Sequence, residues 1–309
     1  MSSAEATGGP EVTLRAGRRR IGEDVVKGVL AVCALISVAT TVGIVVALFV
    51  PAFEFFSEIS IVDFLTGRDW APLFEPARFG VLPLIGGTLL VTGIASAVAM
   101  PFGLGAAIYL SEYASPRMRG ILKPAFEVLA GIPTIVFGYF ALTFVTPLLR
   151  DIGIQVDIFN TLSAGLVMGV MLLPTVASLS EDAMGAVPRD LRDGAYALGS
   201  TKLQVATRIV VPAAVSGIVA SFVLAISRAV GETMIVLVAM GQQPNLTFDP
   251  REAAEAMTAF IAATGAGDVP TGSTEYKTIF AVGATLFVLT LVMNVFAIRL
   301  VRKYREVYE

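Results

Sequence analysis

Long apolar runs limit what this chain can fold into, because each of them is long enough to cross a lipid bilayer. A helix needs about 20 mainly apolar residues to span roughly 30 Å of hydrocarbon. Such runs cover residues 27–52, 84–112, 125–149, 161–180, 208–240 and 278–301. Backbone groups inside lipid must form their hydrogen bonds within the segment itself. The sequence therefore predicts an all-α polytopic membrane protein with six transmembrane helices.

The basic residues outside these runs predict how the helices are oriented. Lys and Arg concentrate in the N-terminal tail, in the connections after the second and fourth runs, and at the C-terminal end. With an even number of helices, all of these segments lie on the same side of the membrane. Connections rich in Lys and Arg stay in the cytoplasm, so both termini are expected to be cytoplasmic.

Two connections on the external side carry signs of ordered structure. Residues 51–83 contain FFSEISIVDFLTGRDWAPLFEP, whose aromatic residues and prolines predict an interfacial helix and a structured loop. Residues 242–276 contain DPREAAEAMTAFIAA, which predicts a short amphipathic helix before a Gly-rich turn. Either segment suits a contact with an external partner, and a solvated loop explains each equally well. We assign no site to them.

Enzymatic chemistry is largely excluded by what the sequence lacks. There is no histidine, which removes His-based acid–base catalysis, Ser-His and Cys-His triads and His-containing metal sites. The single cysteine, Cys33, forms no intramolecular disulfide. The segment GAYALGST at 194–201 has the glycine spacing of a P-loop but lacks its Lys. We expect no enzyme activity, no cofactor and no nucleotide hydrolysis in this chain.

One charged pair interrupts an apolar run. The segment SRAVGETM at 227–234 places Arg228 and Glu232 four residues apart in the fifth run. Residues at i and i+4 share a helix face, and an Arg at bilayer depth costs about 2.5–3.5 kcal/mol on insertion scales. Both side chains are therefore expected to face the bundle interior. An internal ion pair would explain them, but ionisable groups inside membranes usually mark a solute pathway, which we favour.

The longest cytoplasmic connection carries the most specific motif. Residues 181–218 predict two short helices, 188–198 and 202–208, separated by a turn at Gly199. This segment resembles the cytoplasmic EAA loop of type I binding-protein-dependent ABC importer permeases, E-A-A-x3-G-x9-I-x-L-P. The matching residues are Asp193, Gly194, Ala195, Gly199, Ile209, Val211 and Pro212, with Asp, Gly and Val in place of Glu, Ala and Leu. The resemblance implies that residues 181–212 form a coupling loop that contacts an ATPase subunit.

Other stretches resemble the phosphate-specific permeases of this family, and among them the subunit type called PstC. They are FGVLPLIGGTLLVT at 79–92, GIPTIVFGYFALTFVTPLL at 131–149 and SRAVGETMIV at 227–236. The resemblance implies import of inorganic phosphate across the bacterial plasma (inner) membrane. The partners it implies are a homologous PstA-like permease, two copies of an ATPase subunit that hold ATP and Mg, and an external phosphate-binding protein; no nucleic acid is expected.

The same resemblance implies a type I ABC importer permease fold and a division of the chain into regions. A cytoplasmic N-terminal tail covers residues 1–26, and the first helix with its external segment covers 27–83. The permease domain covers 84–301, and a cytoplasmic C-terminal tail covers 302–309.

The chemistry of the charged pair suits phosphate. A guanidinium donates paired hydrogen bonds to the oxygens of an oxyanion and stays charged. Phosphate near neutral pH keeps a proton that a carboxylate can accept, whereas sulfate has none, so Glu232 is expected to restrain Arg228 and to disfavour sulfate. Pro133 and Thr134 are further pathway candidates, because a proline in mid-run predicts a kinked helix. A purely structural kink explains them at least as well.

Two other transport functions stay open at this point. A permease for sulfate or molybdate would share the coupling loop and differ only around the pathway. A secondary transporter would carry ion-coupling groups in several helices, whereas charge away from the ends of these runs is confined to one pair. An intramembrane enzyme fits the sequence least.

Overall fold

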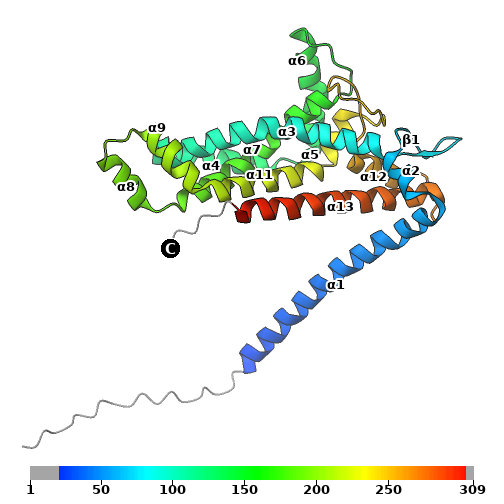
Figure 1. Cartoon of the computed structure of the whole chain (residues 1–309), viewed down its shortest axis with the longest axis horizontal. Helices are drawn as coiled ribbons and strands as arrows, with labels where there is room; N and C mark the ends of the chain where they lie inside the picture. Colours follow the sequence, from blue (N-terminus) through cyan, green and yellow to red (C-terminus); the bar gives the residue numbers. More distant parts are fainter. Residues whose placement is uncertain (1–20, 304–309) are drawn as a thin grey trace, which may run out of the picture. The chain divides into compact units, whose positions relative to one another are not determined.

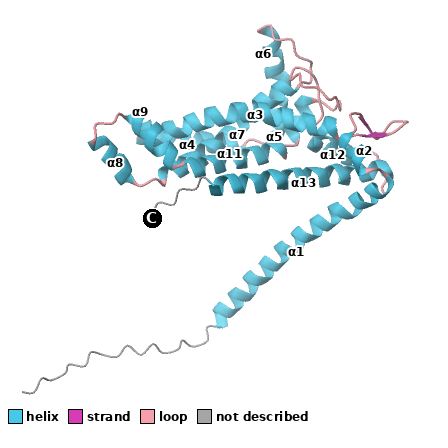
Figure 2. Cartoon of the chain, in the orientation of Figure 1, coloured by secondary structure: helices cyan, strands magenta, loops and turns pink. Residues whose placement is uncertain are grey.

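The computed structural model describes residues 21–303, and most of them are helical (Figure 2). The only strands in this range are β1 (Trp70–Ala71) and β2 (Arg78–Phe79), which pair antiparallel. The chain divides into two compact units, Met1–Ala47 and Leu48–Glu309. The predicted tails, 1–26 and 302–309, lie largely outside the described residues.

Four helices within the described residues are individually long and apolar enough to cross a membrane. They are α1 (Ile21–Glu58), α3 (Leu82–Ile108, continued by the π-helical turn η1, Tyr109–Tyr113), α7 (Thr161–Gly185) and α13 (Thr274–Lys303). These correspond to the first, second, fourth and sixth apolar runs, which are confirmed as helices. Each extends a few residues beyond the predicted run, because polar and aromatic end residues continue the helix past the hydrocarbon.

The third run is broken, so the prediction of one continuous helix over 125–149 is wrong. The helix α4 (Pro116–Gly131) ends before Pro133, and α5 (Thr134–Phe140) leaves at an angle of 89°. It continues through η2 (Ala141–Val145) into α6 (Thr146–Asp151). Proline cannot donate to the preceding turn, and it forces the residue before it out of the helical region. The expected kink at Pro133 is thus confirmed, as a complete break.

The fifth run is interrupted twice, which also corrects the prediction of one helix over 208–240. The segment from α9 (Lys202–Val205) through η3 (Ala206–Val210) and α10 (Val211–Ala213) meets α11 (Val215–Val230) at 71°. A second interruption at residues 231–233 precedes a short helix that ends in η4 (Val236–Met240). Pro212 and Gly231 lie at these two interruptions, where each weakens the helical hydrogen-bond ladder. By length and composition, residues 21–303 hold up to six candidate spans if each bent pair counts as one.

The helices α3, α7 and α11 form the core of the larger unit. A Cβ at Gly169 on α7 would lie 2.6 Å from the Cβ of Val98 on α3, and one at Gly217 on α11 would lie 2.4 Å from that of Ala183 on α7. Glycine at these positions lets the helix backbones approach closely, as is common in membrane bundles. The three helices therefore form a tightly packed scaffold for the segments at their ends.

The connecting segments collect at opposite ends of this scaffold. The helices α8 (Arg189–Ala197) and α9 lie at one end, and α2 (Ile61–Thr66), β1 and α12 (Met257–Gly265) lie at the other (Figure 1). Residues 51–83 contain the predicted short helix, α2, and the predicted structured loop, which holds the strand pair. The predicted amphipathic helix in 242–276 starts later than expected, and residues 253–260 are buried rather than solvated. The small Ala side chains of this segment allow it to pack against α3.

Candidate functional site

Arg228 lies in the last turn of α11, beside α7. Its Nη1 donates a hydrogen bond to Oγ1 of Thr175 at 3.2 Å, and its side chain is otherwise exposed in the isolated chain. No carboxylate within residues 21–303 forms an ion pair with it. A cation near the C-terminus of a helix is favoured by the helix dipole. The guanidinium therefore keeps most of its donors available for a ligand.

Glu232 does not share a helix face with Arg228, which corrects the sequence-based expectation. The helix α11 ends at Val230, and Glu232 lies in the interruption that follows. Its Oε1 accepts hydrogen bonds from the backbone N–H of Met234 at 3.1 Å and of Ile235 at 3.5 Å. Glu232 thus caps the next short helix, as acidic and polar residues commonly do at helix N-termini. It does not restrain Arg228.

The two interrupted runs meet just beyond their breaks. A Cβ at Gly138 on α5 would lie 3.0 Å from the Cβ of Val238 and 3.2 Å from the backbone oxygen of Met234. This close approach places α5 beside the short helix that Glu232 caps. Pro133 and Thr134 begin α5, so they share this neighbourhood. Within residues 21–303, neither Pro133 nor Thr134 forms a hydrogen bond with the side chain of Arg228.

The predicted coupling loop, residues 181–212 (the coupling segment), contains the two short helices and the turn at Gly199 that the sequence predicts. The helix α8 ends at a turn where Gly199 has a φ of +81°, a conformation that favours glycine. The side chain of Ala195 is buried against the bundle, whereas Asp193 and Gly194 are exposed. Leu198, at the C-terminal end of α8, is 89% exposed. The segment thus presents an apolar outer surface of the kind that protein partners cover.

The remaining motif residues follow in the bent segment that leads to α11. Ile209 is half-buried in η3, and Pro212 lies in α10, immediately before the 71° bend. The structure therefore places the seven motif residues along one continuous stretch from α8 to α10.

Arg192 is a residue that the motif analysis did not single out. Its Nη2 lies 3.0 Å from Oε1 of Glu112 in η1 and donates to the backbone oxygen of Met184 at 2.8 Å. Its Nη1 donates to the backbone oxygen of Val187 at 2.7 Å. Glu112 is buried, so this ion pair fastens α8 to the ends of α3 and α7. Glu112 and Arg192 are far apart in the sequence, and no local pattern indicates their contact.

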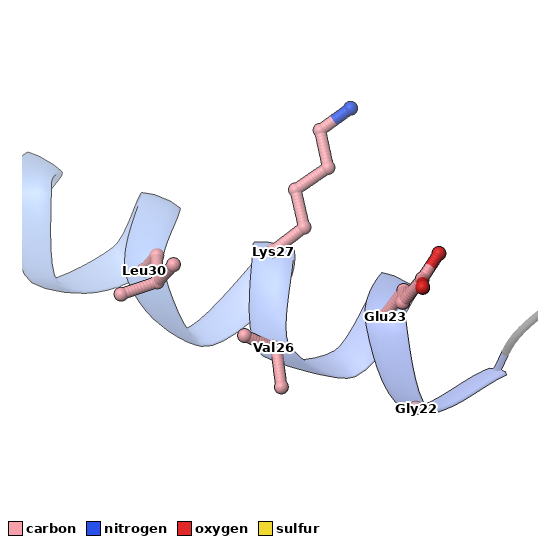
Figure 3. A pocket seen from close by; sticks show the side chains of 5 residues that line it. All are labelled: Gly22, Glu23, Val26, Lys27 and Leu30. Atoms are coloured by element: carbon pink, nitrogen blue, oxygen red, sulfur yellow. The ribbon is translucent and has the colours of Figure 1, made fainter.

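A surface hollow in the smaller unit does not form a comparable site. Its lining residues, Gly22, Glu23, Val26, Lys27 and Leu30, all belong to the first turns of α1. Lys27 and Val26 extend in different directions from the helix (Figure 3). These side chains do not converge on a common point, so we assign no function to the hollow.

The fold is that of a multi-span membrane protein of the transporter class. It combines spanning helices, interrupted helices beside Arg228, and the exposed helix α8 at one end of the bundle. Residues 99–306 match the family described as "Binding-protein-dependent transport system inner membrane component". The chain belongs to this family, and it is a permease subunit of an ABC importer. The family resemblance, the fold class and the membrane location predicted from the sequence are confirmed. The secondary-transporter alternative is set aside.

Individual relatives agree with this assignment. The chain is 34% identical over 288 residues to the "Probable ABC transporter permease protein YqgH" of Bacillus subtilis (strain 168), covering 92% of this chain and 93% of the relative. It is 32% identical over 273 residues to the "Phosphate transport system permease protein PstC" of Mesorhizobium japonicum, covering 81% of each. A solved "bacterial alginate ABC transporter in complex with alginate pentasaccharide-bound periplasmic protein" shares the fold, with a TM-score of 0.64, 17% identity, and coverage of 92% of this chain and 98% of that chain.

Proposed function

We propose that this permease subunit imports inorganic phosphate and that Arg228 lies on the phosphate pathway. The observation that carries the proposal is the guanidinium of Arg228, which has a hydroxyl partner in Thr175 but no carboxylate partner within the described residues. A guanidinium that has no carboxylate partner is complementary to an anion. Relatives named as phosphate transport permeases support the choice of anion.

Thr175 contributes a second polar group beside Arg228. Its hydroxyl already accepts from the guanidinium, and its own proton remains available to a phosphate oxygen. One Arg and one hydroxyl bind an oxyanion weakly, which suits a conduit that must release its solute. High affinity then belongs to the external binding protein.

Glu232 keeps a proposed role in selectivity. Its Oε1 caps the helix, whereas its Oε2 has no hydrogen-bond partner among the described residues. That oxygen can accept the proton of a phosphate ion, and it repels sulfate, which brings no proton. Replacing Glu232 with Gln removes the charge, so the preference for phosphate over sulfate is expected to fall. An unchanged preference would exclude this role.

The proposed assembly follows the family. The partners are a homologous PstA-like permease, two ATPase subunits that hold ATP and Mg, and an external phosphate-binding protein. We assign the α8 end to the cytoplasm, where residues Asp193 to Pro212 contact an ATPase subunit, and the α12 end to the outside. The exposed apolar surface of α8 and the distribution of Lys and Arg support this orientation.

Uptake of labelled phosphate tests the proposal. Cells that depend on this subunit are compared with cells carrying Arg228→Gln, after equal assembly of both complexes has been verified. Arg251→Gln is the matched control, because Arg251 is exposed and pairs with Asp249 outside the spanning helices. We expect loss of uptake only in Arg228→Gln. Equal uptake by both variants would remove Arg228 from the pathway, and competition by sulfate or molybdate in wild type would change the assigned anion.

A further inference from the structure

A pocket of about 460 Å³ lies at the α12 end of the larger unit. Its walls come from residues 70–74, from the loop that begins at Gln242, and from α12 with its flanking residues. These segments lie around the N-terminal end of α3, at the end of the unit opposite α8 (Figure 1). The pocket is thus separate from the Arg228 site and from the coupling segment.

Glu255 supplies the main charge of this pocket. It is only 5% exposed, and its carboxylate has no hydrogen bond or ion pair within the described residues. Burial raises the pKa of this carboxyl group to about 7. A buried carboxylate without a partner is unfavourable, so the pocket is complementary to a cation.

The backbone around Glu255 is held firmly in place. A Cβ at Gly87 would lie 2.3 Å from the backbone oxygen of Glu255, so only glycine on α3 allows this approach. The backbone N–H of Met257 donates to Oγ1 of Thr88 at 2.9 Å. These contacts fix the backbone at Glu255, whose side chain is one of the groups that line the pocket.

The other lining residues agree with a cationic occupant. Asp268 is a second acidic residue in the wall, and no Lys or Arg lines the pocket. The indole N–H of Trp70 is buried without an acceptor within the described residues. The indole N–H is a donor, so it cannot pair with a Lys or Arg head group, which has no acceptor, but it can donate to a backbone carbonyl of an inserted protein segment. An apolar small molecule would leave both Trp70 and Glu255 without a partner.

The rim of the pocket has the character of a protein interface. Leu73 and Phe74 line it and are largely exposed, Phe74 by 73%. Interfaces often combine such an apolar rim with one long side chain inserted into a desolvated pocket. A protein that presents a Lys or Arg therefore fits this site better than a small organic cation, which would leave the rim uncovered.

We propose that the external binding protein docks on this surface by inserting a Lys or Arg side chain toward Glu255. The inference rests on the proposed function, because that function supplies the partner and the external orientation. Charge complementarity and the apolar rim select a basic protein segment as the occupant. The dependence on a binding protein is itself part of the family description.

The docking site is connected to the candidate pathway. The helix α12 begins shortly after Glu255, and Oγ1 of Thr258 in its first turn donates to the backbone oxygen of Glu232 at 2.7 Å. Occupation of the pocket is therefore expected to affect ATP hydrolysis stimulated by the binding protein rather than the basal rate.

The test uses the complete importer in lipid nanodiscs, titrated with its purified phosphate-loaded binding protein. Glu255→Gln removes the charge and keeps the side-chain size, and Glu255→Lys reverses the charge. Glu252→Gln is the matched control, because Glu252 is exposed, lies in the same loop and does not line the pocket. Assembly and basal ATP hydrolysis are measured for every variant.

We expect the affinity for the binding protein to fall at least tenfold in Glu255→Gln and further in Glu255→Lys, and to stay within twofold of wild type in Glu252→Gln. Wild-type affinity retained in Glu255→Gln would overturn the docking proposal. Equal losses in Glu255→Gln and Glu252→Gln would overturn it as well. A wild-type complex that its phosphate-loaded binding protein does not stimulate would instead refute the proposed function, and the docking assignment with it.

Discussion

The buried carboxyl group of Glu255 makes the stability of this chain depend on pH in a defined direction. Its pKa rises from 4.5 to about 7 because burial disfavours the charged form. The folded chain thus holds this proton more tightly than the unfolded chain. Its contribution to stability is complete below about pH 4.5 and is lost as the pH rises through about 7. Glu255→Gln removes this dependence while keeping the side-chain volume.

The magnitude follows from the same values. At 1.36 kcal/mol for each pH unit, a rise from 4.5 to about 7 corresponds to about 3 kcal/mol. This figure is an upper limit, because water in the pocket screens the charge. We therefore expect Glu255→Gln to be more stable than wild type by up to about 3 kcal/mol at pH 8, and by little at pH 5.

Unfolding of the purified chain in mixed detergent micelles by increasing SDS measures this difference at both pH values. The other acidic residue that lines the pocket, Asp268, is present in both proteins, so its contribution cancels in the comparison. Glu252→Gln should differ from wild type by less than about 0.5 kcal/mol at either pH, as is usual for surface substitutions. A stability gain in Glu255→Gln that is the same at pH 5 and pH 8, or a loss at pH 8, would refute the reasoning.

Three further substitutions test the packing that positions the site. Arg192→Gln leaves the buried carboxylate of Glu112 without its cation and should lower the free energy of unfolding by about 3–5 kcal/mol. It should also lower the amount of solute transported per ATP hydrolysed. If that ratio does not change, Arg192 has no role in coupling. Gly138→Val places the new Cβ 3.0 Å from the Cβ of Val238. This overpacking should cost about 1–3 kcal/mol of stability and lower the melting temperature of the complex. An unchanged melting temperature would show that α5 can move aside. Gly199→Ala forces a side chain into a φ of +81° at about 1–2 kcal/mol, measured by the same melting experiment, and Gly199→Asn should cost less.

The sequence predicts the spans well because hydrocarbon thickness sets the length of an apolar run, and that requirement is local. It predicts a kink at Pro133, because proline acts within one turn, but not the complete break that the structure shows. It does not predict the second break of the fifth run, since Gly231 is compatible with a helix in many contexts. The expected pairing of Arg228 with Glu232 depended entirely on helical continuity through that glycine.

Contacts between distant segments account for the remaining differences. From the sequence alone, Glu255 is an ordinary acidic residue in a polar stretch. Its burial depends on a contact with another helix, which is possible only because Gly87 has no side chain. The partner of Arg228 is likewise on another helix, α7. The coupling segment was predicted more fully, because its motif specifies one continuous stretch of chain.

The interrupted helices indicate where a second subunit must pack. Broken backbone at membrane depth is tolerated only where protein or a water-filled cavity surrounds it. In the isolated chain Pro133 and Arg228 are exposed, and none of the residues of α4 is buried. These surfaces cannot all face lipid, because the charge of Arg228 and the unpaired backbone at the break would remain unsatisfied there. The proposed second permease, by covering this face, would enclose Arg228 and the break at Pro133 in one shared cavity, and the proposed solute pathway would then belong to the pair of permeases.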